Sequence, residues 1–278
     1  MNELALFAGA GGGLLATKHL LGWRTVCYVE RDRYCVGVLR ARIREGYLDD
    51  GPIWDDVRTF DGAPWRGCVD IVTAGFPCQP FSQAGKQLGE NDSRNCWPST
   101  IRIIREVRPR FALLENVPRL LSSGYFGQIL GDLAESGYDV RWDCVPASAV
   151  GANHQRDRLW IVVFDTHAGG CRFEVGQEFD GSPIEALAHG DSRRGYVGGL
   201  GDEMAYPDDA GRSVHQSSEQ GTLSLGTYIE RGGSEWWRVE PRLGRVGDGV
   251  ADRVDRVRTI GQGQVPAVVA AVWRVLSL

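Results

Sequence analysis

Hydrophobic and polar positions follow two alternating periods along residues 4–164. Short apolar runs typical of β-strands are separated by longer amphipathic runs typical of helices. The predicted strands cover residues 4–9, 25–30, 70–75, 111–117 and 158–164, and the predicted helices cover residues 14–22, 34–45, 98–107 and 127–137. Strands that alternate with helices favour an α/β fold with a Rossmann-like, mostly parallel sheet covered on both faces. Ligands bind such a sheet at the carboxyl ends of its strands.

The pattern changes after about Asp165, where the chain becomes Gly-rich and polar. Residues 166–172, 188–194 and 205–212 resemble one another loosely, and shared turn chemistry accounts for the likeness better than a repeat does. The last apolar run predicts a helix that begins at Pro266 and packs on the sheet. We therefore expect a sheet domain over residues 1–165, a small loop-rich unit over 166–255, and a returning helical segment over 256–278.

Composition is ordinary for a globular protein, with 42% apolar and 24% charged residues. No apolar run approaches the roughly 18 residues of a membrane span, and the start of the chain does not resemble a signal peptide. We therefore expect a cytoplasmic protein. The seven cysteines form no CxxC pair, so neither disulfides nor a metal site are expected. The net charge of −5 argues mildly against a general nucleic-acid binder, although an acidic chain can still contain a basic cleft.

The segment LFAGAGGG, residues 6–13, lies between a predicted strand and a predicted helix. Glycines there permit a tight turn and a close approach of a ligand to the backbone, but alone they are equally consistent with a simple turn. The next strand ends in Glu30, whose carboxylate can accept hydrogen bonds from a ribose diol. Asp55 and Asp56 follow the third strand end. Together these positions indicate an adenosine-containing cofactor, without distinguishing a nicotinamide from a methyl donor.

The segment DIVTAGFPCQPFSQAGK, residues 70–86, carries Cys78 directly after a predicted strand. Pro77 and Pro80 restrict the loop, so the thiol is held at the carboxyl edge of the sheet. A free cysteine has a pKa of about 8.5 and attacks only as the thiolate, which nearby positive charge must favour. The alternative, a buried structural cysteine, is the interpretation we adopt for most of the other six cysteines.

Two later segments supply charged partners at the same edge. The apolar strand FALLENV ends in Glu115, and a carboxylate in that position is costly unless it has a partner or a task. Arg156 and Arg158, in HQRDRLWIVV, are two positions apart and would lie on the same side of an extended chain. Such a pair is either solvated surface charge or a means of holding a carbonyl group.

The segments FAGAGG, GFPCQPFS, ENV, QRDR and GQGQVP occur in the order and with roughly the spacing of the DNA (cytosine-5) methyltransferases, and the chain resembles the prokaryotic or phage type. The resemblance implies that a cytosine is flipped out of the duplex, that Cys78 attacks ring carbon 6, and that S-adenosyl-L-methionine methylates carbon 5. It gives Glu115 the role of protonating ring nitrogen 3. Arg158 would contact the base carbonyl, and Arg156 would support the nucleophile and the intermediate.

The same resemblance implies the remaining site residues and the partners. The residues expected to bind S-adenosyl-L-methionine are Phe7, Ala8, Gly9, Ala10, Gly11, Gly12, Glu30, Arg31, Asp56, Val57, Phe76, Pro77, Trp97, Gln262 and Gly263. The residues expected to contact the substrate are Gln79, Ser82, Asn116 and Val117. The implied partner is double-stranded DNA, bound by a monomer without a metal ion. Residues 166–255 stand where this family has its target recognition domain, and their small number predicts a recognition site of a few base pairs.

Three positions depart from the family pattern. Ala5 replaces the usual Asp before Leu-Phe, Gln262 replaces an Asn, and His154 replaces a Gln. These changes leave room for an altered cofactor fit. Two other interpretations remain open, a nucleotide-dependent oxidoreductase and a non-catalytic DNA-binding homologue. A third, RNA methylation, is disfavoured because the two-cysteine RNA methyltransferases usually carry a cysteine in the motif that contains Glu115 here.

Overall fold

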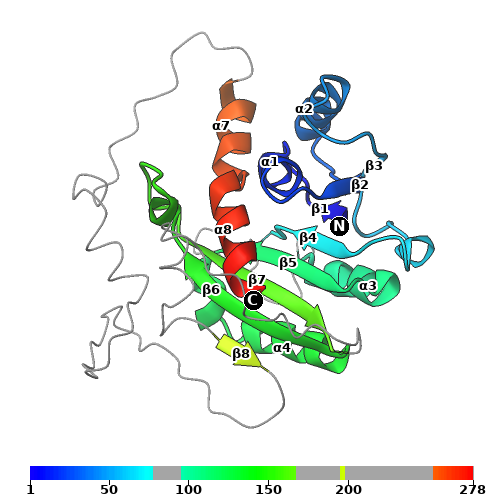
Figure 1. The fold of residues 1–278 in the computed structure, drawn as a ribbon, viewed down its shortest axis with the longest axis vertical. Helices are drawn as coiled ribbons and strands as arrows, with labels where there is room; N and C mark the ends of the chain where they lie inside the picture. Colours follow the sequence, from blue (N-terminus) through cyan, green and yellow to red (C-terminus); the bar gives the residue numbers. More distant parts are fainter. Residues whose placement is uncertain (78–94, 167–194, 198–252, 278) are drawn as a thin grey trace.

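The computed structural model describes residues 1–77, 95–166, 195–197 and 253–277. The described residues form an eight-stranded sheet in the order β3-β2-β1-β4-β5-β7-β6-β8 (Figure 1). The strands are β1 (Asn2–Leu6), β2 (Arg24–Val29), β3 (Ile53–Trp54), β4 (Ile71–Ala74), β5 (Phe111–Asn116), β6 (Tyr138–Val145), β7 (Arg158–Asp165) and β8 (Gly195–Val197). The helices are α1 (Gly12–His19), α2 (Arg33–Arg44), α3 (Trp97–Val107), α4 (Tyr125–Glu135), α7 (Arg253–Gln262) and α8 (Pro266–Leu276). Short 3₁₀ helices cover Ala63–Trp65, Pro118–Ser122 and Ala147–Val150.

The first five strands of this order are parallel to one another. β1 pairs with β2 and β4, β2 pairs with β3, and β4 pairs with β5, all in the parallel sense. Each link between β1 and β2, and between β4 and β5, contains a helix that returns the chain to the start of the sheet. The predicted α/β fold is confirmed, because the strand-and-helix alternation forms this parallel part of the sheet.

The other part of the sheet is antiparallel. β7 pairs with β5 and with β6 in the antiparallel sense, and β6 pairs likewise with β8. In the β5–β7 register, Asn116 lies opposite Leu159, so β7 begins where β5 ends. The first residues of β7 therefore lie at the carboxyl edge of the parallel strands, the edge where ligands bind.

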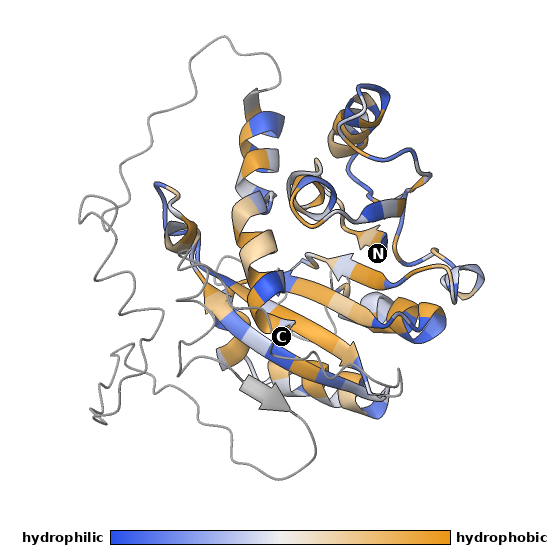
Figure 2. Ribbon diagram, in the orientation of Figure 1, coloured by the Kyte–Doolittle hydropathy of each residue, from blue (hydrophilic) through white to orange (hydrophobic). Residues whose placement is uncertain are grey.

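Alternate residues of the strands contribute to two cores. Leu114 of β5 belongs to a cluster that includes residues of α3 and α4, whereas Leu113 belongs to a cluster on the opposite face with residues of α1 and α8. This alternation follows from the period of two in a strand. β5 and β7 are predominantly apolar along their lengths, as expected for strands covered on both faces (Figure 2).

The C-terminal helix α8 is an integral part of the second core. It begins at Pro266, as predicted, with proline in its first turn. Trp273 makes edge-on contacts with Trp23 at a ring centroid distance of 4.9 Å and with Phe111 at 5.3 Å. The predicted packing of this helix on the sheet is confirmed. The segment just before it is thereby brought to the carboxyl edge of the sheet.

The predicted loop-rich unit, residues 166–255, lies largely outside the described residues. Within it, β8 extends the sheet by pairing with β6. Across the described ranges, no helix combines the length and the apolar character that a membrane crossing requires.

Candidate active site

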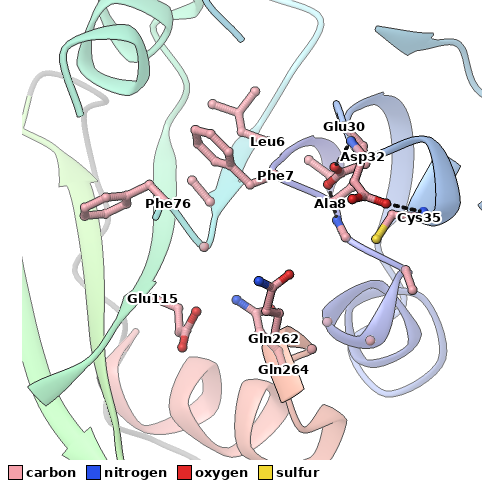
Figure 3. A pocket seen from close by; sticks show the side chains of 18 of the residues that line it. Leu6, Phe7, Ala8, Glu30, Asp32, Cys35, Phe76, Glu115, Gln262 and Gln264 are labelled. Carbon is pink, nitrogen blue, oxygen red and sulfur yellow. Dashed lines mark hydrogen bonds between the residues drawn. The ribbon is translucent and has the colours of Figure 1, made fainter. Parts of the chain in front are cut away.

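A cavity of about 1000 Å³ lies at the carboxyl edge of the parallel strands (Figure 3). Its lining comes from the segments that follow β1, β2, β4 and β5, and from α7 and the connection between α7 and α8. This is the volume and the position expected of a cofactor or substrate site in an α/β protein.

The turn after β1 and the carboxylate of Glu30 form one unit. Phe7 and Gly9 have positive φ angles of 54° and 55°, so the chain bends sharply as it leaves the strand. The Gly9 N–H donates to Glu30 Oε2 at 2.7 Å, and the Asp32 N–H donates to Glu30 Oε1 at 2.7 Å. Each oxygen of Glu30 keeps a further lone pair for a donor within the cavity. The carboxylate is therefore fixed in place and can accept hydrogen bonds from a diol.

Gly12 and Gly13 leave room for the C-terminal segment to pack closely against the start of α1. A Cβ atom at Gly12 would lie 2.8 Å from the backbone oxygen of Gln264, and one at Gly13 would lie 2.1 Å from Gln264 Oε1. At Gly12 the obstacle is backbone, so a side chain there would displace the C-terminal segment, whereas at Gly13 the obstacle is the side chain of Gln264. Gly11 faces the other way, because a Cβ atom there would meet Leu39 and Leu48.

Helix α7 closes one side of the cavity against the start of α2. Asp32 caps α2 by accepting hydrogen bonds from the N–H groups of Tyr34 and Cys35. Arg258 of α7 forms an ion pair with Asp32 at 2.6 Å. The backbone hydrogen bond from Cys35, together with the charge of Arg258, holds the pKa of the Asp32 carboxyl below its usual value.

Glu115 and Arg158 form an ion pair at the adjoining end of the cavity. Arg158 Nε lies 3.0 Å from Glu115 Oε1, and only 13% of the Glu115 side chain is exposed. Burial raises the pKa of the Glu115 carboxyl above its ordinary value, and the charge of Arg158 opposes this rise. The pair can form because β7 is antiparallel to β5, so that its first residue lies beside the end of β5. A carboxyl with a raised pKa is suited to donating a proton.

Arg156 has a different partner from Arg158. The expectation that both arginines extend from the same side of an extended chain is wrong, because Arg156 has a φ angle of 40° and precedes the strand. Its guanidinium donates to the carbonyl oxygens of Gly261, at 2.9 Å, and of Gly263. Arg156 therefore holds the connection between α7 and α8 against the start of β7.

Asn116 fixes the loop that leads to the predicted nucleophile. Its side chain is 3% exposed, and its Nδ2 donates to the carbonyl oxygen of Phe76 at 3.0 Å. Its Oδ1 accepts from the N–H of Val117 at 2.9 Å. The ring of Phe76 packs against Trp97 at a centroid distance of 5.4 Å. The chain is thus held firmly up to Pro77, whereas Cys78, Gln79 and Ser82 lie outside the described residues.

The structure brings most of the predicted cofactor residues to the cavity. Those that line it are Phe7, Ala8, Gly9, Ala10, Gly12, Glu30, Arg31, Asp56, Val57, Phe76, Pro77, Gln262 and Gly263. Glu115, Arg158, Asn116 and Val117 line it as well. Gly11 and Trp97 are not among the described residues that form its wall. Trp97 is 1% exposed, and its Nε1 donates to Asp132 at 2.6 Å, so it supports Phe76 from the core.

The departure at Ala5 has a structural counterpart on the same strand face. Glu3, two positions earlier in β1, is fully buried and borders the cavity. It accepts hydrogen bonds from the hydroxyl groups of Thr17, Thr25 and Thr73 at 2.7 to 2.9 Å. Burial raises the pKa of the Glu3 carboxyl. On this face of β1 the carboxylate at position 3 borders the cavity, whereas position 5 carries the small apolar side chain of Ala5.

Gln264 and Arg258 are two of the cavity residues that the sequence did not predict. Gln264 belongs to the segment GQGQVP, from which only Gln262 and Gly263 were selected. Gln264 lies just before the apolar helix that begins at Pro266, and the packing of that helix on the sheet would have predicted that Gln264 lies near the site. Arg258 gave no such signal, because a charged residue on a polar helix is ordinarily solvated. The described His, Cys, Asp and Glu side chains form no group of three or more that could hold a metal ion.

A family model described as C-5 cytosine-specific DNA methylase matches residues 1–179. The chain belongs to this family. The matched residues contain the glycine turn, Glu30, Cys78, Glu115 and Arg158. The C-5 cytosine-specific DNA methylases use S-adenosyl-L-methionine as methyl donor.

Bacterial relatives agree with this assignment. The type II methyltransferase M.NgoMIV of Neisseria gonorrhoeae is 35% identical over 164 residues, which cover 58% of this chain and 51% of that protein. The type II methyltransferase M.PspPI of a Psychrobacter species is 42% identical over 166 residues, which cover 56% of this chain and 38% of that protein. The chain thus spans about half or less of the length of these curated relatives.

A solved structure supports the fold over a wider range. The methyltransferase EhMeth of Entamoeba histolytica aligns with a TM-score of 0.59 over 99% of this methylase chain and 97% of its own. The sequence identity is 13%, so this likeness concerns the fold alone.

Proposed function

We propose that this methylase transfers a methyl group from S-adenosyl-L-methionine to carbon 5 of cytosine in double-stranded DNA. The observation that carries the proposal is the Glu115–Arg158 ion pair at the edge of the cavity. A carboxyl of raised pKa and a guanidinium suit the ring nitrogen and the carbonyl of a cytosine. The loop fixed by Asn116 continues directly into Cys78, the nucleophile of the proposed reaction.

The cavity residues fit the cofactor. Glu30, held by two backbone N–H groups, would accept hydrogen bonds from the ribose diol, and Asp56 would accept from the adenine amino group. Phe76 presents an apolar surface backed by Trp97. When bound, S-adenosyl-L-methionine supplies an electrophilic methyl group. Glu115 lines the same cavity as the predicted cofactor residues, so a base held by Glu115 would lie beside the cofactor.

The protein residues prepare the base for the transfer. The Cys78 thiolate adds to ring carbon 6, while Glu115 donates a proton to ring nitrogen 3. This addition converts carbon 5 into an enamine-like centre that can attack a methyl group. In the transfer the methyl–sulfur bond would break with its electrons left on sulfur, and a water molecule acting as base would then take the proton from carbon 5. The electrons of that C–H bond would restore the ring double bond and expel the thiolate, and the proton on nitrogen 3 would return to Glu115. Arg158 would hold the base carbonyl and balance the charge of Glu115 once Glu115 has given up its proton.

The target base must leave the helix to reach these residues. The Glu115 side chain lines the cavity and is only 13% exposed, so a base within a stacked duplex would not reach it. Flipping costs a few kcal/mol of stacking and pairing, which contacts in the cavity must offset. Residues 166–255 would form a target recognition domain that selects a short DNA sequence, residues 1–165 the catalytic domain, and residues 256–278 a segment returning to it. A monomer contains one complete site.

The direct test is transfer of a tritiated methyl group to unmethylated duplex DNA, followed by bisulfite sequencing of the product. We expect label in DNA and protected cytosines in one short sequence context. Duplex RNA of the same sequence, and DNA already methylated at that context, are the controls and should remain unlabelled. A folded protein that binds S-adenosyl-L-methionine but labels no DNA would contradict the proposal and favour a non-catalytic DNA-binding homologue.

A second prediction concerns Glu30. In Glu30→Gln, one of the two N–H donors from Gly9 and Asp32 loses its acceptor, and the negative charge facing the ribose is lost. Hydrogen bonds to charged groups contribute about 1.5–3 kcal/mol, so the Kd of S-adenosyl-L-methionine should rise by about 10- to 100-fold. Isothermal titration calorimetry measures this. Glu45→Gln, which removes an exposed carboxylate at the end of α2, is the matched control and should bind normally.

A further inference from the structure

Gln264 lies where three distant parts of the chain meet. A Cβ atom at Gly13 would lie 2.1 Å from Gln264 Oε1, and one at Gly75 would lie 3.3 Å from Gln264 Nε2. The same Cβ atom at Gly75 would lie 3.0 Å from Glu115 Oε2. The side chains of Gln264 and Glu115 form a hydrogen bond. Gln264 therefore reaches from the C-terminal segment, past Gly13 and Gly75, to the carboxyl of Glu115. Figure 3 shows Gln262 and Gln264 extending into the cavity from the side opposite Glu115.

The backbone that carries Gln264 is held on both sides. Before it, Arg156 donates to the carbonyl oxygens of Gly261 and Gly263, and the Gly263 N–H donates to Thr259 at 2.9 Å. After it, Pro266 begins α8, which is anchored in the core. A side chain on a support of this kind can orient a neighbour, because the support itself has little freedom to move.

The two oxygens of Glu115 face two different donors. Oε1 lies 3.0 Å from Arg158 Nε, whereas Oε2 lies on the side of Gly75 and Gln264 Nε2. The charges of Arg158 and Arg156 already lower the pKa of Glu115 and oppose the effect of burial. A further cation in the place of Gln264 would favour the ionised form still more, whereas a neutral amide can orient the carboxyl and still allow it to be protonated.

We propose that Gln264 is a positioning residue for Glu115, whose carboxyl it orients toward the substrate base. This inference rests on the proposed function, in which Glu115 donates a proton to that base. Gln262, two positions earlier, lines the same cavity as a predicted cofactor residue. The connection between α7 and α8 would thus bind the cofactor through Gln262 and orient the proton donor through Gln264.

The test is Gln264→Leu, which keeps much of the side-chain volume but removes the amide. We expect kcat for methyl transfer to fall by about 10-fold or more, with the Kd of S-adenosyl-L-methionine unchanged within about twofold. Because Gln264 lowers the pKa of Glu115, its loss should also shift the limb of the pH–rate profile that reports Glu115 to higher pH. Gln264→Asn, with a shorter reach, should behave in the same way.

Ile260→Ala is the matched control, because Ile260 is 75% exposed on α7 and belongs to neither site. It should leave kcat, Kd and the pH profile unchanged. Carboxyl NMR of Glu115 in the intact protein provides a readout that does not need turnover, and its titration should move upward in Gln264→Leu. An unmoved titration would overturn the proposal even if the protein methylates no DNA. Loss of S-adenosyl-L-methionine affinity in proportion to kcat would overturn it as well, in favour of a role in cofactor binding.

Discussion

Replacing Glu115 by glutamine should reduce methyl transfer by about 10²- to 10⁴-fold, the usual contribution of a general acid. Glutamine has the same shape as the protonated acid and can still donate a hydrogen bond to the base, but it cannot transfer the proton. S-adenosyl-L-methionine should bind with unchanged affinity. Single-turnover transfer to a DNA duplex measures the rate of the chemical step. A rate within about threefold of the wild type would exclude Glu115 as the proton donor.

The same substitution should stabilise the folded protein at neutral pH. Burial raises the pKa of Glu115, so the folded state holds its proton more tightly than the unfolded state does. The stability that the protonated carboxyl contributes is complete below the unfolded pKa and is lost as the pH rises through the folded pKa. Glu115→Gln keeps a neutral group at every pH. In urea unfolding, the variant should therefore match the wild type near pH 4 and exceed it at pH 8.

The opposite result in urea would be equally informative. A variant less stable than the wild type at pH 8 would mean that the ion pair with Arg158, at 3.0 Å, outweighs the cost of burying the carboxylate. Arg158→Met in the Glu115→Gln background would separate these contributions, because the double variant removes both charges and keeps most of the volume.

Cys78→Ser should abolish methyl transfer, with a loss of at least about 10³-fold. A serine hydroxyl is a much weaker acid than a thiol, so it forms too little alkoxide to add to the ring. DNA that contains 5-fluorocytosine tests the covalent step, because fluorine cannot leave carbon 5 as a cation and elimination is blocked. The wild type should form a denaturation-resistant complex with this DNA, and Cys78→Ser should not. The control is Cys68→Ser, which alters an exposed cysteine. A resistant complex in Cys78→Ser would assign the nucleophile to another residue.

The fold was predictable where local pattern and topology agree. Short apolar runs separated by amphipathic ones predict parallel strands linked by helices, and β1, β2, β4 and β5 obey this rule. β6 was not predicted, although Asp139, Arg141 and Asp143 alternate with apolar residues in the period of two that is typical of a half-buried strand. The strands that were predicted are continuous apolar runs, which β6 lacks. The direction of β7 was also missed, since a buried strand has the same composition whether it runs parallel or antiparallel. That direction depends on how β6 and β7 pair, which is a long-range property.

The parts of the site that could be predicted are those whose residues stand in short, recognisable sequence motifs. Glycines after a strand and an acid at the end of the next strand predict the contact of Gly9 with Glu30, which the structure contains. Contacts between distant segments were beyond the sequence pattern. Nothing near Arg156 indicates that it binds the backbone around Gly263, or that Gln264 approaches Glu115. These contacts depend on where the C-terminal helix docks.

The contacts of Arg156 with Gly261 and Gly263 join positions 105 and 107 residues apart in the sequence. The entropic cost of closing a long chain segment grows only with the logarithm of its length, by about 0.6 kcal/mol for each doubling. Insertions or deletions between Asp165 and Arg253 should therefore change the free energy of forming the Arg156 contacts only slightly. Descendants of such a protein can lengthen, shorten or exchange that segment through evolution while the catalytic edge remains intact.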